Sequence, residues 1–106
     1  MYVKISEQYY NIANLKYFEY KEGMLCLYFL GTLVSQIEQT QDDFESFINF
    51  VCVNRLATFE NNLGINLKTV TNFNISKNEN SFFFIDGSYK NFDINKETLE
   101  KFISEE

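Results

Sequence analysis

The sequence predicts an α+β fold in which two pseudo-repeated antiparallel β-meander-plus-helix units are fused into one small domain. The chain has 106 residues, enough for one domain with a modest core. A shift of 55 positions aligns residues 10–50 with residues 65–105 without a gap, and most apolar positions coincide. We therefore expect a single domain over residues 1–106 with an internal repeat, 10–50 and 65–105. The alternative is that two meanders, each followed by a helix, are alike without a common origin.

Three strands are predicted in each repeat from alternating or continuous apolar residues bounded by turns. The six predicted strands are Leu15–Tyr20, Leu25–Leu30, Leu33–Ile37, Val70–Ile75, Ser81–Ile85 and Ser88–Phe92. The turn residues between them include Gly31-Thr32 and the Asp86-Gly87 pair, which is typical of hairpins. The continuous apolar runs favour strands covered on both faces, by the sheet of the other repeat or by a second subunit.

A helix is predicted at the end of each repeat. Thr40 and Asn95 are suitable N-cap residues, and acidic residues follow both of them. Apolar side chains then recur at helical spacing. The predicted buried faces consist of Phe44, Phe47, Ile48 and Val51 in the first helix, and Leu99, Phe102 and Ile103 in the second.

The junction between the repeats allows two interpretations. The favoured one continues the first helix to Leu56 or Phe59, because the apolar residues keep helical spacing and Gly64 is a suitable stop. In the other, residues 52–59 form a strand that corresponds to an opening strand over Tyr2–Ile5. No Pro-, Gly- or Ser-rich linker separates the halves, which favours one fused domain.

The composition argues against catalysis. The chain has no His, which excludes Ser–His and Cys–His nucleophile pairs, His metal ligands and His pH switches. Its 2 Cys cannot form a zinc knuckle or a disulfide framework. No acidic pair, phosphate loop or EF-hand loop stands in a catalytic or cation-binding motif. We expect no enzyme, no catalytic residue, no metal and no cofactor.

Cys26 and Cys52 are both embedded in apolar sequence, which favours free thiols over a disulfide between them. The N-terminus lacks the pattern of a signal peptide, and the longest apolar run, Met24–Leu30, is too short to span a membrane. We expect a cytoplasmic protein, in the host cytoplasm if the chain is phage-encoded.

An acidic stretch is the most distinctive charge feature. The chain has 9 Lys plus Arg against 15 Asp plus Glu, and no basic residue lies between Lys21 and Arg55. An acidic face of this kind suits docking on a basic surface, with electrostatic steering. The candidate partner-binding carboxylates are Glu38, Asp42, Asp43 and Glu45. The alternative is that Asp42 and Asp43 complement a helix N-terminus while the other acids keep the protein soluble.

The tyrosines are also unevenly distributed, since all but Tyr89 of the 7 tyrosines precede residue 30. Tyrosine is favoured at interfaces because it combines a large ring with a polar tip. Strand alternation places Tyr17 on the opposite face from Phe18 and Tyr20, so one of the faces should be partly exposed. Tyr17 and Tyr20 are therefore candidate partner-binding residues; the alternative is that tyrosine is simply a good strand residue.

No motif links the sequence to a family, but at the level of class it resembles small acidic phage-encoded inhibitors, including anti-CRISPR proteins. It also resembles bacterial immunity proteins that neutralise toxins. The resemblance rests on 106 residues, a net charge of -6, the acidic stretch and an Asn-, Phe- and Ile-rich composition. It implies a non-enzymatic inhibitor that docks on a basic, nucleic-acid-handling protein such as a CRISPR effector, without direct nucleic-acid or membrane contact. An immunity protein for a cognate toxin and a structural homodimer module are the alternatives.

Overall fold

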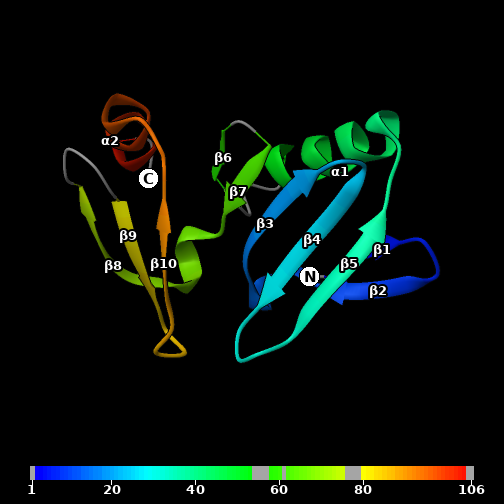
Figure 1. Cartoon of the computed structure of the whole chain (residues 1–106), viewed down its shortest axis with the longest axis horizontal. Coiled ribbons are helices and arrows are strands. Elements are labelled where there is room, and N and C mark those ends of the chain that lie inside the picture. Colours follow the sequence, from blue (N-terminus) through cyan, green and yellow to red (C-terminus); the bar gives the residue numbers. More distant parts are fainter. Residues whose placement is uncertain (1, 54–57, 61, 76–79, 105–106) are drawn as a thin grey trace.

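A computed structural model of the chain describes residues 2–53, 58–60, 62–75 and 80–104 (Figure 1). In these residues the predicted α+β fold is confirmed, with antiparallel sheets and two α-helices. The strands are β1 (Tyr2–Ile5), β2 (Gln8–Asn11), β3 (Leu15–Lys21), β4 (Met24–Phe29), β5 (Val34–Glu38), β6 (Thr58–Glu60), β7 (Leu63–Ile65), β8 (Val70–Ile75), β9 (Asn80–Phe84) and β10 (Tyr89–Phe92). The helices are α1 (Gln41–Val53) and α2 (Lys96–Ser104), with short 3-10 helices η1 (Ile12–Asn14) and η2 (Leu67–Thr69).

The same succession of elements occurs twice along the chain. A hairpin, a 3-10 helix, a three-stranded meander and an α-helix appear first as β1 to α1 and again as β6 to α2. Local details agree as well: the side chains of Asn11 and Asn66 each accept a hydrogen bond of 3.2 Å from the backbone N–H two residues on. The strand pairing shifts register at equivalent places in β3 and β8. A common origin of the two halves stays a prediction.

Both helices begin at their predicted caps. The Thr40 hydroxyl accepts a hydrogen bond of 3.1 Å from the Asp43 N–H, and the Asn95 side chain accepts one of 2.8 Å from the Glu97 N–H. These bonds satisfy N–H groups that lack a partner within the first helical turn. The predicted apolar faces are buried at Phe44, Phe47, Val51 and Leu99, and Ile48 is half-buried. The side chains of Phe102 and Ile103 lie outside the described residues.

The favoured prediction for the junction is wrong at its C-terminal end. α1 ends at Val53, and Thr58–Glu60 form strand β6 rather than a continuation of the helix; Leu56 lies outside the described residues. The helical spacing gave the wrong prediction because this segment pairs with β7 as a strand. Thr58 and Phe59 are also residue types that suit a strand. Gly64, the predicted helix stop, lies within β7.

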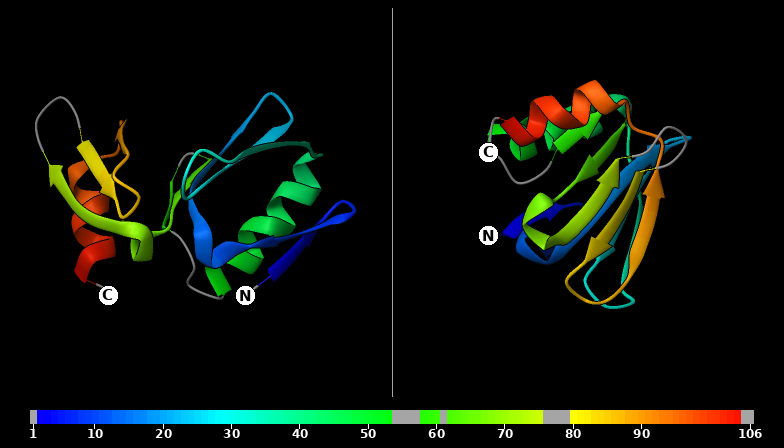
Figure 2. Two further views of the ribbon diagram at one scale, coloured as in Figure 1. Left: turned by 90° about the horizontal axis from the view of Figure 1, so that it is seen from below. Right: turned by 90° about the vertical axis from the view of Figure 1, so that its left-hand side faces the viewer.

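The β6–β7 hairpin of the second repeat completes the sheet of the first. The five-stranded sheet has the order β5-β4-β3-β7-β6, while β8, β9 and β10 form a separate sheet and β1 and β2 another. Figure 2 shows that α1 lies across one face of the five-stranded sheet. The three-stranded sheet and α2 form the neighbouring half of the molecule. The two repeats are therefore joined by backbone hydrogen bonds between β3 and β7.

Two apolar cores result, one within the first repeat and one between the repeats. The first core includes Phe18, Leu25, Leu27, Phe44 and Val51. The second core includes Tyr17, Ile65, Phe82, Phe84, Phe92, Ile94 and Leu99. The second repeat thus covers part of the sheet face that α1 leaves open, which is one of the two covers that the apolar strand runs favoured.

Tyr17 lies in the second core. Its predicted alternation is correct, because Phe18 belongs to the first core. One of the two faces was expected to be partly exposed; Tyr17 is only 9% exposed, whereas Tyr20 on the other face is half-buried. The Tyr17 ring stacks on Tyr28 at 4.3 Å between centroids and meets Phe92 edge-on at 5.0 Å. A tertiary partner from the other repeat occupies the space that the strand pattern assigns to solvent.

The burial of Tyr17 predicts a loss of stability at alkaline pH. Burial, aided by the neighbouring Tyr28 and Glu19, raises the pKa of Tyr17 to about 12. An unfolded tyrosine has a pKa of about 10, so this contribution is complete below pH 10 and is lost as the pH rises towards 12. Urea unfolding across this range should show a smaller loss of unfolding free energy in Tyr17→Phe than in the wild type. Equal losses in both proteins would contradict the assignment.

Candidate functional site

The long hairpins of the two repeats meet at one end of the molecule, away from the α-helices (Figure 1). The β4–β5 turn (30–33) and the β9–β10 turn (85–88) lie side by side there, because the Gly31 N–H donates a 2.8 Å hydrogen bond to Asp86 Oδ2. Gly31 and Gly87 have φ angles of +83° and +87°, which only glycine adopts readily.

Each turn is held by the 3-10 helix of its own repeat. The Leu30 N–H donates to the Asn14 carbonyl at 2.8 Å, and the Ile85 N–H donates to the Thr69 carbonyl at 2.9 Å. These bonds occupy equivalent positions in the two repeats. We call the two turns together with η1 and η2 the hairpin end.

An ion pair between a buried lysine and a carboxylate of the second turn fastens the two turns together. Lys16 Nζ lies 3.1 Å from Asp86 Oδ2, and it donates to Ser88 Oγ at 3.0 Å and to the Gly31 carbonyl at 3.4 Å. The Lys16 and Asp86 side chains are only 10% and 14% exposed. Burial acts to raise the pKa of Asp86, but hydrogen bonds from Ser88, Gly31 and Lys16 outweigh it and hold that pKa well below its usual range. Asp86 is therefore ionised at neutral pH and is neutralised by Lys16.

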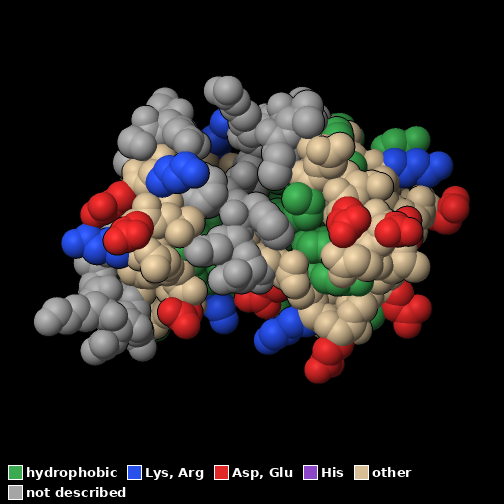
Figure 3. All heavy atoms as spheres, turned by 90° about the horizontal axis from the view of Figure 1, so that it is seen from above, with side chains coloured by type: hydrophobic (Ala, Val, Ile, Leu, Met, Phe, Trp, Pro, Cys, Tyr) green, Lys and Arg blue, Asp and Glu red, His purple; other side chains and the backbone are tan. Residues whose placement is uncertain are grey.

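Charge is unevenly divided between the two ends of the strands. The hairpin end contains Lys68 and Asp86, and Lys16 and Lys90 lie in the strands directly next to it. Lys68 and Lys90 are exposed. The opposite end, where β3 turns into β4 and β5 leads to α1, carries the exposed carboxylates of Glu22, Glu38, Asp42, Asp43 and Glu45. Figure 3, which views the molecule from above, shows acidic side chains over both halves, with basic side chains among them. The chain is acidic as a whole, but its hairpin end is not.

Large apolar side chains are also exposed at the hairpin end. Leu33 is 62% exposed and Ile85 is 56% exposed, and the first residues of β5 and β10, Val34 and Tyr89, are 47% and 66% exposed. Exposed apolar residues that gather in one region mark interaction sites, whereas scattered ones need no explanation. The Asp86-Gly87 turn was evident in the sequence, but no local signal places it beside Gly31.

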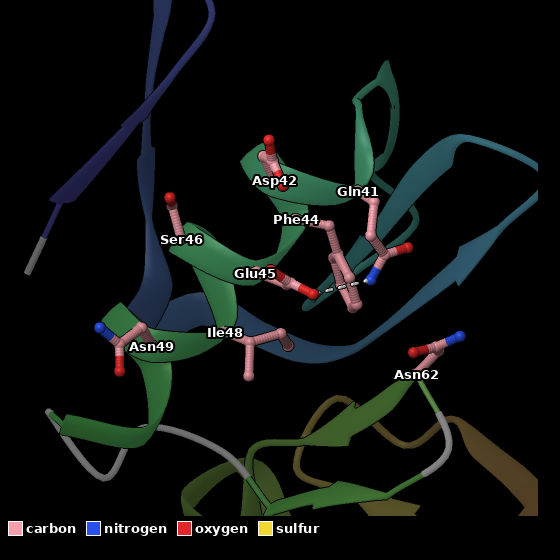
Figure 4. A pocket seen from close by; sticks show the side chains of 8 residues that line it. All are labelled: Gln41, Asp42, Phe44, Glu45, Ser46, Ile48, Asn49 and Asn62. Carbon is pink, nitrogen blue, oxygen red and sulfur yellow. Dashed lines mark hydrogen bonds between the residues drawn. The ribbon is translucent and has the colours of Figure 1, made fainter.

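The predicted carboxylates lie elsewhere. Glu38 ends β5, and Asp42, Asp43 and Glu45 occupy the first turns of α1. Asp42 and Glu45 line an open groove along α1 that extends to Asn62 (Figure 4). Gln41 Nε2 donates to Glu45 Oε1 at 3.4 Å within it. The structure thus brings the four acids to one end of the molecule.

The two predicted tyrosines do not join those acids as a free surface. Tyr17 lies in the second core. The Tyr20 hydroxyl donates to the Gln39 carbonyl at 2.9 Å, and its half-buried ring stacks on Phe44 at 4.1 Å between centroids. Both side chains are engaged in packing.

Within the described ranges, no three Cys, Asp or Glu side chains gather as a metal site would require. The Cys26 thiol is free, as expected. The described helices include none with the length and apolar character needed to cross a bilayer.

The comparison with protein-family models gave no match, and the comparison with curated proteins gave none either. Among solved structures, the fold is similar to a LytTr DNA-binding domain from Bacillus cereus, described as part of a response regulator. The TM-score is 0.62 at 9% sequence identity, and the match covers 98% of this chain and 93% of that chain. At this identity the likeness is one of fold.

This finding contradicts the function predicted from the sequence, because a domain with the same fold over nearly the whole chain is described as DNA-binding. The predicted protein-binding inhibitor, of a CRISPR effector or of a toxin, is therefore wrong, as is the expectation of no nucleic-acid partner. The prediction depended on the net charge of -6, which is a sum over the chain. Such a sum does not show that Glu22, Glu38, Asp42, Asp43 and Glu45 lie at one end while Lys68 and Lys90 are exposed at the other.

Proposed function

We propose that this chain is a non-catalytic DNA-binding domain that contacts duplex DNA with its hairpin end. The observation that carries the proposal is the fold likeness to a DNA-binding domain, which extends over 98% of the chain. The uneven charge distribution supports the choice of surface, because phosphate groups are attracted to lysines and repelled by carboxylates.

The hairpin end offers both kinds of group that protein–DNA contacts use. Lys68 and Lys90 are exposed beside the turns and suit phosphate contacts, which position a protein on the duplex. Asn14 and Thr32 are exposed polar side chains that suit hydrogen bonds to base edges. Strands and two-stranded ribbons contact DNA in the major or the minor groove, and here two ribbons lie side by side.

The net charge of -6 then has a definite consequence for binding. Because few lysines face the DNA and the opposite end is acidic, non-specific affinity is low and its salt dependence is shallow. The acidic end also orients the molecule, since the field of the DNA repels that end and leaves the hairpin end leading. Discrimination between sequences must come mainly from contacts to the bases.

The same proposal treats residues 1–106 as one domain. The pairing of β7 with β3 and the packing of Tyr17 among residues of both repeats support this. The domain thus presents two turns to a duplex in a fixed position relative to each other, rather than two independent hairpins.

Charge reversal at the hairpin end should weaken DNA binding. We expect a Lys68→Glu/Lys90→Glu variant to bind a random-sequence duplex pool about tenfold more weakly than the wild type at low salt, with a salt slope reduced by about one per lost contact. Fluorescence anisotropy at several salt concentrations measures both quantities. Lys21→Glu is the matched control, because it reverses an exposed lysine at the opposite end of β3.

Two results would count against the proposal. If selection with the wild-type chain recovers no duplex from the pool at low salt, DNA binding is wrong. If Lys21→Glu weakens binding as much per charge as the paired substitution does, the hairpin end is the wrong surface. Circular dichroism of each variant ensures that the comparison is made between folded proteins.

A further inference from the structure

We propose that Leu33 and Ile85, one from each turn of the hairpin end, insert between base pairs of bound DNA as apolar wedges. This inference rests on the proposed function and adds the mode of contact. Leu33 is 62% exposed and Ile85 is 56% exposed, although leucine and isoleucine side chains are usually buried. Phosphate contacts need polar groups, so they do not account for these two side chains. Insertion between base pairs does, and it differs from an apolar contact with a base edge in that it unstacks the bases.

The two side chains stand on adjacent turns. The Gly31 N–H to Asp86 bond of 2.8 Å ties the turn that contains Leu33 to the turn that contains Ile85. Lys68 lies in η2, the 3-10 helix that is bonded to the Ile85 N–H through the Thr69 carbonyl. Lys90 lies in β10, four residues after Asp86. Wedges flanked by lysines suit a duplex, in which the base stack lies between two phosphate backbones.

The turns are rigid enough to act as wedges. The Leu33 carbonyl accepts a 2.9 Å hydrogen bond from the Phe29 N–H, and the Ile85 N–H donates one of 2.9 Å to Thr69. The Lys16–Asp86 pair fixes the second turn from inside. A preordered backbone loses little conformational entropy on insertion, so more of the gain from burying the side chains is kept.

The chemistry of the occupant favours DNA over a second copy of this chain. Proteins that kink duplexes insert Leu, Ile, Phe, Met or Pro between base steps, and burial of the wedge offsets the cost of unstacking. A second copy seated on the same surface would instead bring two sets of exposed lysines together. The partner that fits these observations is therefore duplex DNA that becomes unstacked at the contacted steps.

The test uses the full chain and a duplex recovered by selection from the random pool, with 2-aminopurine substituted at successive adenines. The fluorescence of this base rises when it unstacks, and we expect a rise at the contacted steps with the wild type. A Leu33→Ala/Ile85→Ala variant should lose that rise and bind about tenfold more weakly, since each truncation removes buried apolar area. Leu33→Met/Ile85→Met should restore both, while Lys68→Glu/Lys90→Glu at saturating concentration should keep the rise.

The outcomes separate the inference from the proposed function. DNA binding without any rise in the wild type overturns the wedge and leaves the proposed function standing, whereas no binding at all overturns the proposed function. An unchanged rise in the alanine variant also overturns the wedge. Light scattering provides the last arm: if the alanine variant converts a dimer to a monomer and leaves the fluorescence unchanged, the patch binds a second copy instead.

Discussion

Replacement of Gly64 with alanine is expected to lower the free energy of unfolding by about 3 kcal/mol or more, because the added methyl group overlaps the ring of Phe18. Gly64 and Phe18 are directly paired across β7 and β3. Phe18 is fully buried and packs edge-on against Phe47 at 5.0 Å between centroids, so its ring has no free space to enter. The overlap can be relieved only by separating two paired strands or by disturbing the first core.

Urea denaturation of the two proteins measures this effect, and Gly31→Ala is the control. A Cβ at Gly31 meets nothing within 4 Å, so its cost of about 1 kcal/mol comes from the positive φ alone. A Phe18→Leu/Gly64→Ala variant should be more stable than the sum of the single effects, because the smaller side chain makes room. If Gly64→Ala costs no more than Gly31→Ala, the close packing of Gly64 against Phe18 is wrong.

Loss of Asp86 is expected to cost about 2 to 3 kcal/mol, because the buried Lys16 ammonium then has no counter-ion. Loss of Lys16 is expected to cost less, because Asp86 lies in an exposed turn where water screens its charge. Asp86 also accepts hydrogen bonds from Gly31 and Ser88, so Asp86→Asn loosens both turns at once. A double-mutant cycle with Lys16→Met and Asp86→Asn isolates the coupling between the two side chains. A coupling energy near zero would mean that the pair does not fasten the turns.

The same pair predicts how stability depends on acid. The pKa of Asp86 is depressed in the folded protein, so its contribution is present above the unfolded value of about 4 and is lost as the pH falls below it. The difference in unfolding free energy between the wild type and Asp86→Asn should therefore shrink as the pH is lowered from 5 towards 2. A difference that stays constant over this range would contradict the depressed pKa.

Most of the local structure could be predicted because its causes are local. Val70–Ile75 is a strand with the predicted bounds, and the Thr40 and Asn95 caps are set by the residues that immediately follow them. The junction could not be predicted in the same way. Thr58–Glu60 form a strand because β7 pairs with them, and β7 is in place because β3 lies on its other side. The spacing of apolar residues within the segment contains no information about such strand partners.

The candidate site was missed for a related reason. Gly31 and Asp86 were both recognised as turn residues, but they are 55 positions apart, and their contact depends on how the repeats pack. Lys16 reads as an ordinary strand lysine in the sequence, yet it is buried between the two turns. Conversely, the acidic stretch was a correct observation about composition, but the structure places it at the end away from the exposed turns.

The sharing of one sheet between the repeats has a consequence for synthesis. While the ribosome has delivered only the first repeat, the β3 backbone has no neighbour on the side that β7 later occupies, and Tyr17 lacks its ring contacts with Phe84 and Phe92. An unpaired strand edge next to an exposed aromatic ring is a site of self-association. The nascent chain is thus most vulnerable until the strand that ends at Ile65 has emerged, and slow translation of that segment would lengthen the exposure.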